Sequence, residues 1–108
     1  MQGLQLVIAH LGMPEYAAFL ELAERYERVH LDTTMFATDF TERLMPFDPA
    51  DRARLSALRA KVLLGSDFPS IPYAYAHQLQ ALHRLDLGEE WLRAVLWHNG
   101  ARLFTIEA

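Results

Sequence analysis

The stretch Val62-Leu63-Leu64-Gly65-Ser66-Asp67-Phe68-Pro69 decides the fold that we predict for this chain. Its apolar run is too short for a helix and is bounded by turn-forming residues, which is typical of a buried strand. Asp67 lies at the carboxyl end of that strand, and Pro69 ends it because proline has no N–H group for a strand ladder. Parallel α/β proteins carry their chemistry at such strand ends. The stretch therefore predicts an α/β fold with a functional carboxylate at position 67.

One upstream stretch has the same design, and a second is also predicted to be a strand. Residues 4–10 form the first predicted strand, and His10 ends its apolar run as Asp67 ends the run described above. Residues 29–34, with the sequence Val-His-Leu-Asp-Thr-Thr, form the second predicted strand. The stretch from Met35 to Phe47 has no clear period and is predicted to be a long loop.

Helical patterns separate and follow the three strands. Pro14 suits the first position of a helix, and an apolar face follows it at Tyr16, Phe19, Leu20 and Ala23. Three further helices are predicted: about 49–59, capped by Asp48 and buried at Leu55 and Leu58; about 73–83, with Ala76, Leu79 and Leu82 on one face; and one opened by Glu89, with Leu92, Val95 and Leu96 on its apolar face and Asn99 as its stop. Strands that alternate with helices in this way predict right-handed crossovers and a parallel sheet.

Composition limits the class of protein. The 108 residues are 52% hydrophobic and 22% charged, which predicts one globular domain over 1–108. The formal charge is −4 and no basic block is present, so nucleic acid is not an expected partner. No apolar run approaches the roughly 18 residues that span a bilayer, and no secretory signal is visible, so no membrane partner is expected either. The absence of cysteine excludes disulfides and thiolate metal sites and fits a cytoplasmic protein.

The polar residues at the strand ends are the candidate site. In parallel βα units these ends meet on one side of the sheet, so His10, Asp67 and the Asp32-Thr33-Thr34 segment should converge. An imidazole and a carboxylate there can ligate Zn²⁺ or a similar divalent ion, or can act as an acid/base pair. A purely structural pairing of His10 with Asp67 is the alternative, and structural roles are also assigned to Asp32 and to the remaining histidines: His30, His77, His83 and His98.

Four segments together resemble one known family. They are Ile8-Ala9-His10-Leu11-Gly12, Leu31-Asp32-Thr33-Thr34, Leu64-Gly65-Ser66-Asp67-Phe68-Pro69 and Asn99-Gly100-Ala101-Arg102-Leu103-Phe104. In order and spacing they are similar to the C-terminal part of the amidohydrolase-related family of TIM-barrel metal-dependent hydrolases, which includes aromatic-acid decarboxylases. The resemblance covers nearly the whole chain. It implies a partial (β/α)8 barrel whose three strands are the sixth, seventh and eighth.

The resemblance also implies roles for two residues. Asp67 would bind the catalytic metal and accept a proton from its water, and His10 would orient or activate that water and contact the substrate. Both residues are candidate metal ligands. The metal would be divalent, with Zn²⁺ preferred and Mn²⁺ as the second choice. The family's first strand carries a His-x-His pair and its fifth strand another metal-binding histidine, and neither is present here. We therefore expect an enzyme fragment that is inactive alone.

Three functions follow from these expectations. The first is hydrolysis of an amide, ester or lactone of a small-molecule substrate by metal-activated water. The second, within the same fold, is metal-dependent decarboxylation of a small organic acid. The third is a non-catalytic remnant that self-associates as a homo-oligomer, because an open edge strand at residues 4–10 invites pairing.

Overall fold

The computed structural model describes residues 4–65 and 74–104. Its elements, in chain order, are β1 (Leu6–Ile8), η1 (Ala9–Gly12), α1 (Tyr16–Arg25), β2 (Val29–Asp32), α2 (Asp39–Leu44), η2 (Pro49–Asp51), α3 (Arg52–Ala57), η3 (Arg59–Lys61), β3 (Val62–Leu63), α4 (Tyr75–Arg84), α5 (Glu89–Arg93), the π-helical turn η4 (Ala94–His98) and α6 (Asn99–Leu103). None of the helices within these ranges is long and apolar enough to cross a membrane.

The three strands form one parallel sheet in the order β1-β2-β3. Ile8 lies opposite Leu31 and Leu31 opposite Val62, so the short apolar runs line up across the sheet. This confirms the predicted α/β class and the parallel direction of the strands. The strands are shorter than predicted, because β1 ends at Ile8 and His10 lies in the turn that follows it.

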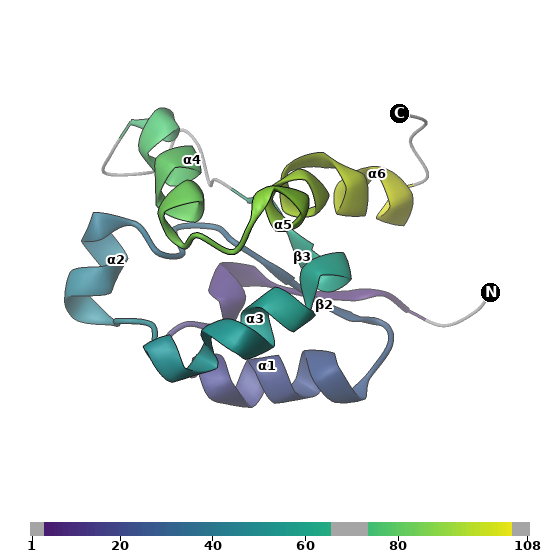
Figure 1. Cartoon of the computed structure of the whole chain (residues 1–108). Coiled ribbons are helices and arrows are strands. Elements are labelled where there is room, and N and C mark those ends of the chain that lie inside the picture. The colour runs from purple at the N-terminus through teal and green to yellow at the C-terminus, as the bar shows by residue number, and fades with distance from the viewer. Residues whose placement is uncertain (1–3, 66–73, 105–108) are drawn as a thin grey trace.

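The core lies between the sheet and the helices that cover it. Figure 1 shows α1 and α3 on one side of the strands and α5 and α6 on the other. Leu31 and Val62 of the sheet are fully buried, as are Leu20 of α1 and Leu55 of α3. Burial of apolar side chains of this size contributes about 1.5–3 kcal/mol each, which makes this layer the main source of stability. On the predicted apolar face of α1, Tyr16, Leu20 and Ala23 are buried and Phe19 is partly buried. Leu55 and Leu58 are buried, as predicted for residues 49–59.

Three buried aromatic rings pack against one another in the core. Tyr16, Phe36 and Phe47 are all buried and contact one another edge to face, with ring centroids 5.1–5.6 Å apart. The Tyr16 hydroxyl donates a hydrogen bond to the Met45 carbonyl oxygen at 3.0 Å. Burial, together with the Glu42 carboxylate, raises the pKa of Tyr16 to about 12, so this phenol stays neutral at physiological pH.

Residues 35–47 are not the continuous loop that we predicted, because α2 lies within them. Thr38 caps this helix by accepting a hydrogen bond from the Thr41 N–H group, and Asp39 follows in the first turn, where an anion is favourable. Leu44 and Phe40 remain exposed. The helix therefore has a cap signal but no apolar period, which is why periodicity alone missed it.

Two predicted helix features are wrong at the C-terminal end of the chain. Asn99 does not stop a helix, since α5, η4 and α6 run on without interruption. Its buried side-chain amide instead donates to the backbone carbonyls of Arg59 and Val62, which ties α6 to the start of β3. Leu96 is 39% exposed, whereas Trp91 is buried and donates from Nε1 to the Leu55 carbonyl.

Two helices differ in detail from their predicted form. In α4 the buried positions are Gln78, Ala81 and Leu82, whereas Ala76 is exposed. The buried face therefore differs from the predicted one, and it includes Gln78, whose side chain is hydrogen-bonded to backbone groups of Thr33, Met35 and Phe36. Pro14 does not open α1, which begins at Tyr16.

Candidate functional site

His10 lies at the carboxyl end of the sheet, as predicted, and is partly exposed there. It belongs to the tight turn η1, in which His10 has φ 56° and ψ 28° and Leu11 has φ 52° and ψ 25°. Both residues are therefore in the left-handed region, which costs a non-glycine residue about 1–2 kcal/mol. A turn of this kind persists only where neighbouring groups hold it.

Asp32, the last residue of β2, contacts this turn directly. One carboxylate oxygen, Oδ1, accepts hydrogen bonds from the backbone N–H of His10 at 3.2 Å and from that of Thr34 at 2.9 Å. Hydrogen bonds to an ionised acceptor are about twice as strong as neutral ones. The carboxylate therefore links the end of β1 to the loop that follows β2.

The orientation of the His10 ring is fixed by a third contact. Its Nδ1 atom lies 3.0 Å from the carbonyl oxygen of Thr34. A carbonyl oxygen can only accept a hydrogen bond, so in this contact Nδ1 carries the proton, and in the neutral imidazole Nε2 then has the lone pair. Histidine ligands and general bases in enzymes use this arrangement, in which one nitrogen is anchored on a carbonyl and the other is left to react.

The end of β3 lies against the same group of residues. The Gly65 N–H donates to Thr33 Oγ1 at 3.2 Å. A Cβ atom at Gly65 would stand only 2.2 Å from Thr34 Oγ1 and 3.0 Å from Asp32 Cγ, so only glycine allows this approach. Three strand ends therefore converge, as the sequence predicts. Asp67 lies outside the described residues, and its place beside His10 stays a prediction.

The other histidines lie elsewhere. His30 is near the opposite end of the sheet and lines a small pocket with Arg28 and Arg102. Its pKa is lowered by burial and by the nearby Lys61 ammonium group. His77 accepts a hydrogen bond from the Asp39 N–H at 3.0 Å, which joins α4 to α2, while His83 and His98 are exposed. These positions agree with the structural roles expected for them.

The residues that the structure describes do not form a complete metal site. Across 4–65 and 74–104, no group of three His, Asp or Glu side chains is placed to hold a metal ion. His10 fits the role of one ligand, because Nδ1 is anchored on a carbonyl and Nε2 of the neutral ring would be the ligating atom. Asp32 has one oxygen occupied by two N–H donors, so its contacts are those of a residue that holds the turn.

The contacts of Asp32 agree with the structural role expected for it, but its link to His10 through Thr34 was not predicted. The signal that could have found the contact of Asp32 with His10 is positional: Asp32 follows the apolar run of its strand just as His10 follows the apolar run of residues 4–10. Polar residues at equivalent strand ends in neighbouring βα units meet in space. The Thr34 contact runs through a backbone carbonyl, which no residue pattern reveals.

Fold and site together define a parallel α/β protein in which the ring of His10 is anchored at the carboxyl ends of the strands. A family model described as Amidohydrolase matches residues 1–106, and the chain belongs to this family. The family folds as TIM barrels, and its members generally use divalent metals. Among curated proteins, no significant match to the chain was found.

Proposed function

We propose that this chain forms the last three strands, the sixth to the eighth, of a metal-dependent hydrolase barrel. Membership of the amidohydrolase family supports hydrolysis as the general reaction. The three-stranded parallel sheet with its helices is compatible with part of an eight-stranded barrel. The open side of β1, which pairs only with β2 among the described residues, is where a further strand would add.

The observation that carries this proposal is the anchored imidazole of His10, whose Nδ1 meets the Thr34 carbonyl. In the proposed site His10 would hold the metal or orient the attacking water through Nε2 of the neutral ring, and Asp67 would bind the metal and accept a proton from that water. A divalent ion, with Zn²⁺ preferred to Mn²⁺, would supply a water of lowered pKa and would polarise the carbonyl of an amide, ester or lactone.

The number of ligands limits what the chain does alone. A catalytic zinc ion usually has three protein ligands, and His10 with Asp67 provides two. We propose that the remaining ligands come from other strands of the barrel. The chain by itself should therefore bind divalent ions weakly and should not turn over an ester, lactone or anilide.

The experiment that tests this proposal maps where Mn²⁺ binds on the ¹⁵N-labelled chain. The paramagnetic ion broadens amide signals near its site even when binding is weak. We expect broadening centred on the amides of His10, Thr34 and Gly65, and we expect its loss in His10→Ala and in Asp67→Asn. Asp86→Asn, which changes an exposed carboxylate remote from these residues, is the matched control and should leave the pattern unchanged.

Two results would contradict the proposal. Broadening that persists at the same amides in both site variants would show that His10 and Asp67 do not bind the ion. Turnover of the model substrates by the chain, abolished in Asp67→Asn, would show that residues 1–108 hold a complete site and that the ligand count above is wrong.

A further inference from the structure

The side chain of Asp32 is placed to fix the backbone and the ring orientation of His10. Its Oδ1 atom accepts from the N–H of His10 and from the N–H of Thr34. The Thr34 carbonyl in turn accepts from Nδ1 of His10. One carboxylate oxygen thus holds both the backbone of the histidine and the residue whose carbonyl selects the protonated ring nitrogen.

The backbone of the turn shows why such a restraint is needed. His10 and Leu11 are consecutive non-glycine residues at positive φ, a conformation that is unfavourable for residues with a Cβ atom. A hydrogen bond to an ionised acceptor is stronger than one between neutral groups. The bond that Asp32 accepts from the His10 N–H therefore helps to keep the turn in its left-handed form.

The end of β3 in turn restrains Asp32. A Cβ atom at Gly65 would stand 3.0 Å from both Cγ and Oδ1 of Asp32, so the carboxylate is packed closely against the backbone of β3. The side chain is partly exposed, and its Oδ1 already has two donors. These contacts restrict Asp32 to the orientation in which Oδ1 faces the turn.

We propose that Asp32 is a positioning residue that keeps His10 in the Nδ1–H tautomer with Nε2 directed away from the Thr34 carbonyl. This inference rests on the proposed function, since an unprotonated Nε2 is what a metal ligand or general base requires. It adds a residue to the machinery that acts through His10 and does not itself touch the metal or the substrate.

The test reads the tautomer of His10 in the metal-free chain. Long-range ¹H–¹⁵N correlations in ¹⁵N-histidine-labelled protein distinguish Nδ1–H from Nε2–H. We expect the Nδ1–H form in the wild type and in Asp32→Asn, because the amide oxygen of asparagine can still accept from both N–H groups. In Asp32→Leu we expect a mixture of both tautomers. Glu90→Leu, at an exposed carboxylate on α5, is the matched control and should keep the wild-type tautomer.

Several outcomes would overturn the inference. The Nε2–H form in the wild type would do so without any variant, even if Asp32→Leu failed to fold. A folded Asp32→Leu variant that keeps the Nδ1–H form would show that Asp32 does not position the ring.

Because no metal is added, this test is separate from the test of the proposed function. If Mn²⁺ fails to bind near His10 while the tautomers behave as expected, the proposed function fails and the positioning role stands. If Mn²⁺ binds near His10 but the tautomer is insensitive to Asp32→Leu, the positioning role fails alone.

Discussion

At the scale of single residues, Gly65 sets how closely β3 approaches the candidate site. We predict that Gly65→Ala destabilises the chain by about 1–3 kcal/mol, because the new methyl group would overlap Thr34 Oγ1 at 2.2 Å and something must shift. Urea unfolding followed by circular dichroism measures this change. Adding Thr34→Ala should recover part of the loss, but not all of it, since Asp32 Cγ is also close.

Gly100 provides the matched control for this substitution. It lies inside α6, and a Cβ atom there would have no heavy atom within 4 Å beyond its own helix turn and neighbours. Gly100→Ala should therefore be neutral or stabilising by up to about 1 kcal/mol, from helix propensity. If Gly65→Ala were as stable as Gly100→Ala, the close packing of β3 against Thr34 and Asp32 would be wrong.

Tyr16 gives a residue-scale prediction about pH. Its pKa is about 12 in the folded chain and close to 10 when unfolded, so the neutral phenol favours folding. That contribution is complete below pH 10 and is lost as pH rises from 10 toward 12. Tyr16→Phe lacks the hydrogen bond to Met45, so we expect it to be about 1 kcal/mol less stable at pH 7.

The measurement compares urea unfolding of wild type and Tyr16→Phe from pH 7 to pH 11. The difference in unfolding free energy should shrink above pH 10, because only the wild type must keep this phenol from ionising. A constant difference over the whole range would show that burial does not raise the pKa of Tyr16.

At the scale of elements, α4 is held to the candidate site by Gln78. Its buried side chain donates from Nε2 to the carbonyls of Thr33 and Phe36 and accepts from the Met35 N–H at 3.1 Å. Gln78→Leu would leave these backbone groups without that partner, and we expect a loss of about 3 kcal/mol. Gln80→Leu, on the exposed side of the same helix, should change stability by less than about 0.5 kcal/mol.

Hydrogen exchange measures the consequence for the site. The amides of Met35 and Phe36 should exchange faster in Gln78→Leu. Gln78 accepts directly from the Met35 N–H, and the Phe36 N–H lies in the same turn, where it donates to the Thr33 carbonyl. Equal exchange rates in Gln78→Leu and Gln80→Leu would show that α4 does not order this loop.

The elements also differ in how far the sequence could predict them. The three stretches 4–10, 29–34 and 62–67 were sufficient to predict the parallel sheet, because a strand needs only a short stretch bounded by turn-forming residues. The cap of α2 is a local hydrogen bond, which Thr38 Oγ1 accepts from the Thr41 N–H, and hydrophobic periodicity does not register such a cap. The buried Gln78 of α4 donates to the Thr33 carbonyl, a contact that depends on tertiary placement.

The candidate site was predictable in part. Topology predicts that His10, Asp67 and the segment 32–34 converge, and the structure brings His10 and Asp32 together, whereas the place of Asp67 stays a prediction. The tautomer of His10 could not be predicted, because it depends on a carbonyl that reaches the ring only through a left-handed turn. Neither residue 10 nor residue 11 is a glycine or an asparagine, the residue types that would predict such a turn.

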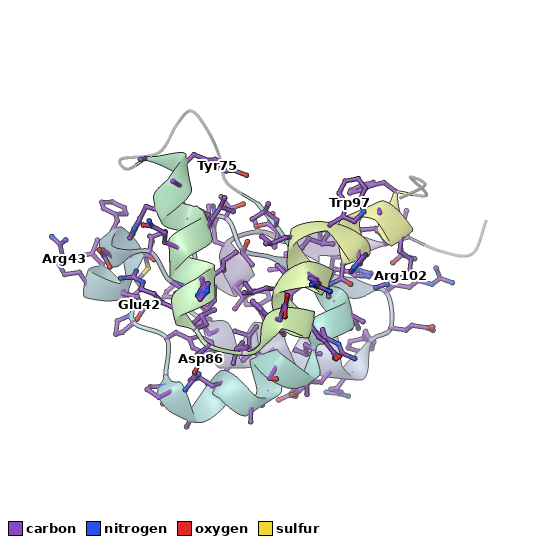
Figure 2. All side chains as sticks on the ribbon, turned by 45° about the horizontal axis from the view of Figure 1, so that its top comes forward. Glu42, Arg43, Tyr75, Asp86, Trp97 and Arg102 are labelled. Carbon is purple, nitrogen blue, oxygen red and sulfur yellow. The ribbon has the colours of Figure 1, made fainter. Side chains whose placement is uncertain are left out.

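At the scale of the whole molecule, apolar side chains remain exposed along one strand. Leu4 is 77% exposed, Leu6 51% and Val7 37%, and β1 pairs on one side only among the described residues. Trp97, which Figure 2 shows on the outer side of the C-terminal helices, is 47% exposed. An apolar strand with an open edge is a template for pairing with another chain.

We therefore predict that the chain self-associates through β1. Sedimentation velocity should show the average mass rising with concentration, and Val7→Lys should suppress that rise, because an edge-strand lysine cannot lose its hydration cheaply. Leu44→Lys is the control, since Leu44 is 65% exposed on α2, away from the strands. If both lysine variants suppressed the rise equally, association would come from exposed apolar surface in general and not from β1. A wild-type chain that stays monomeric at every concentration would show that the open edge of β1 does not bind a second copy.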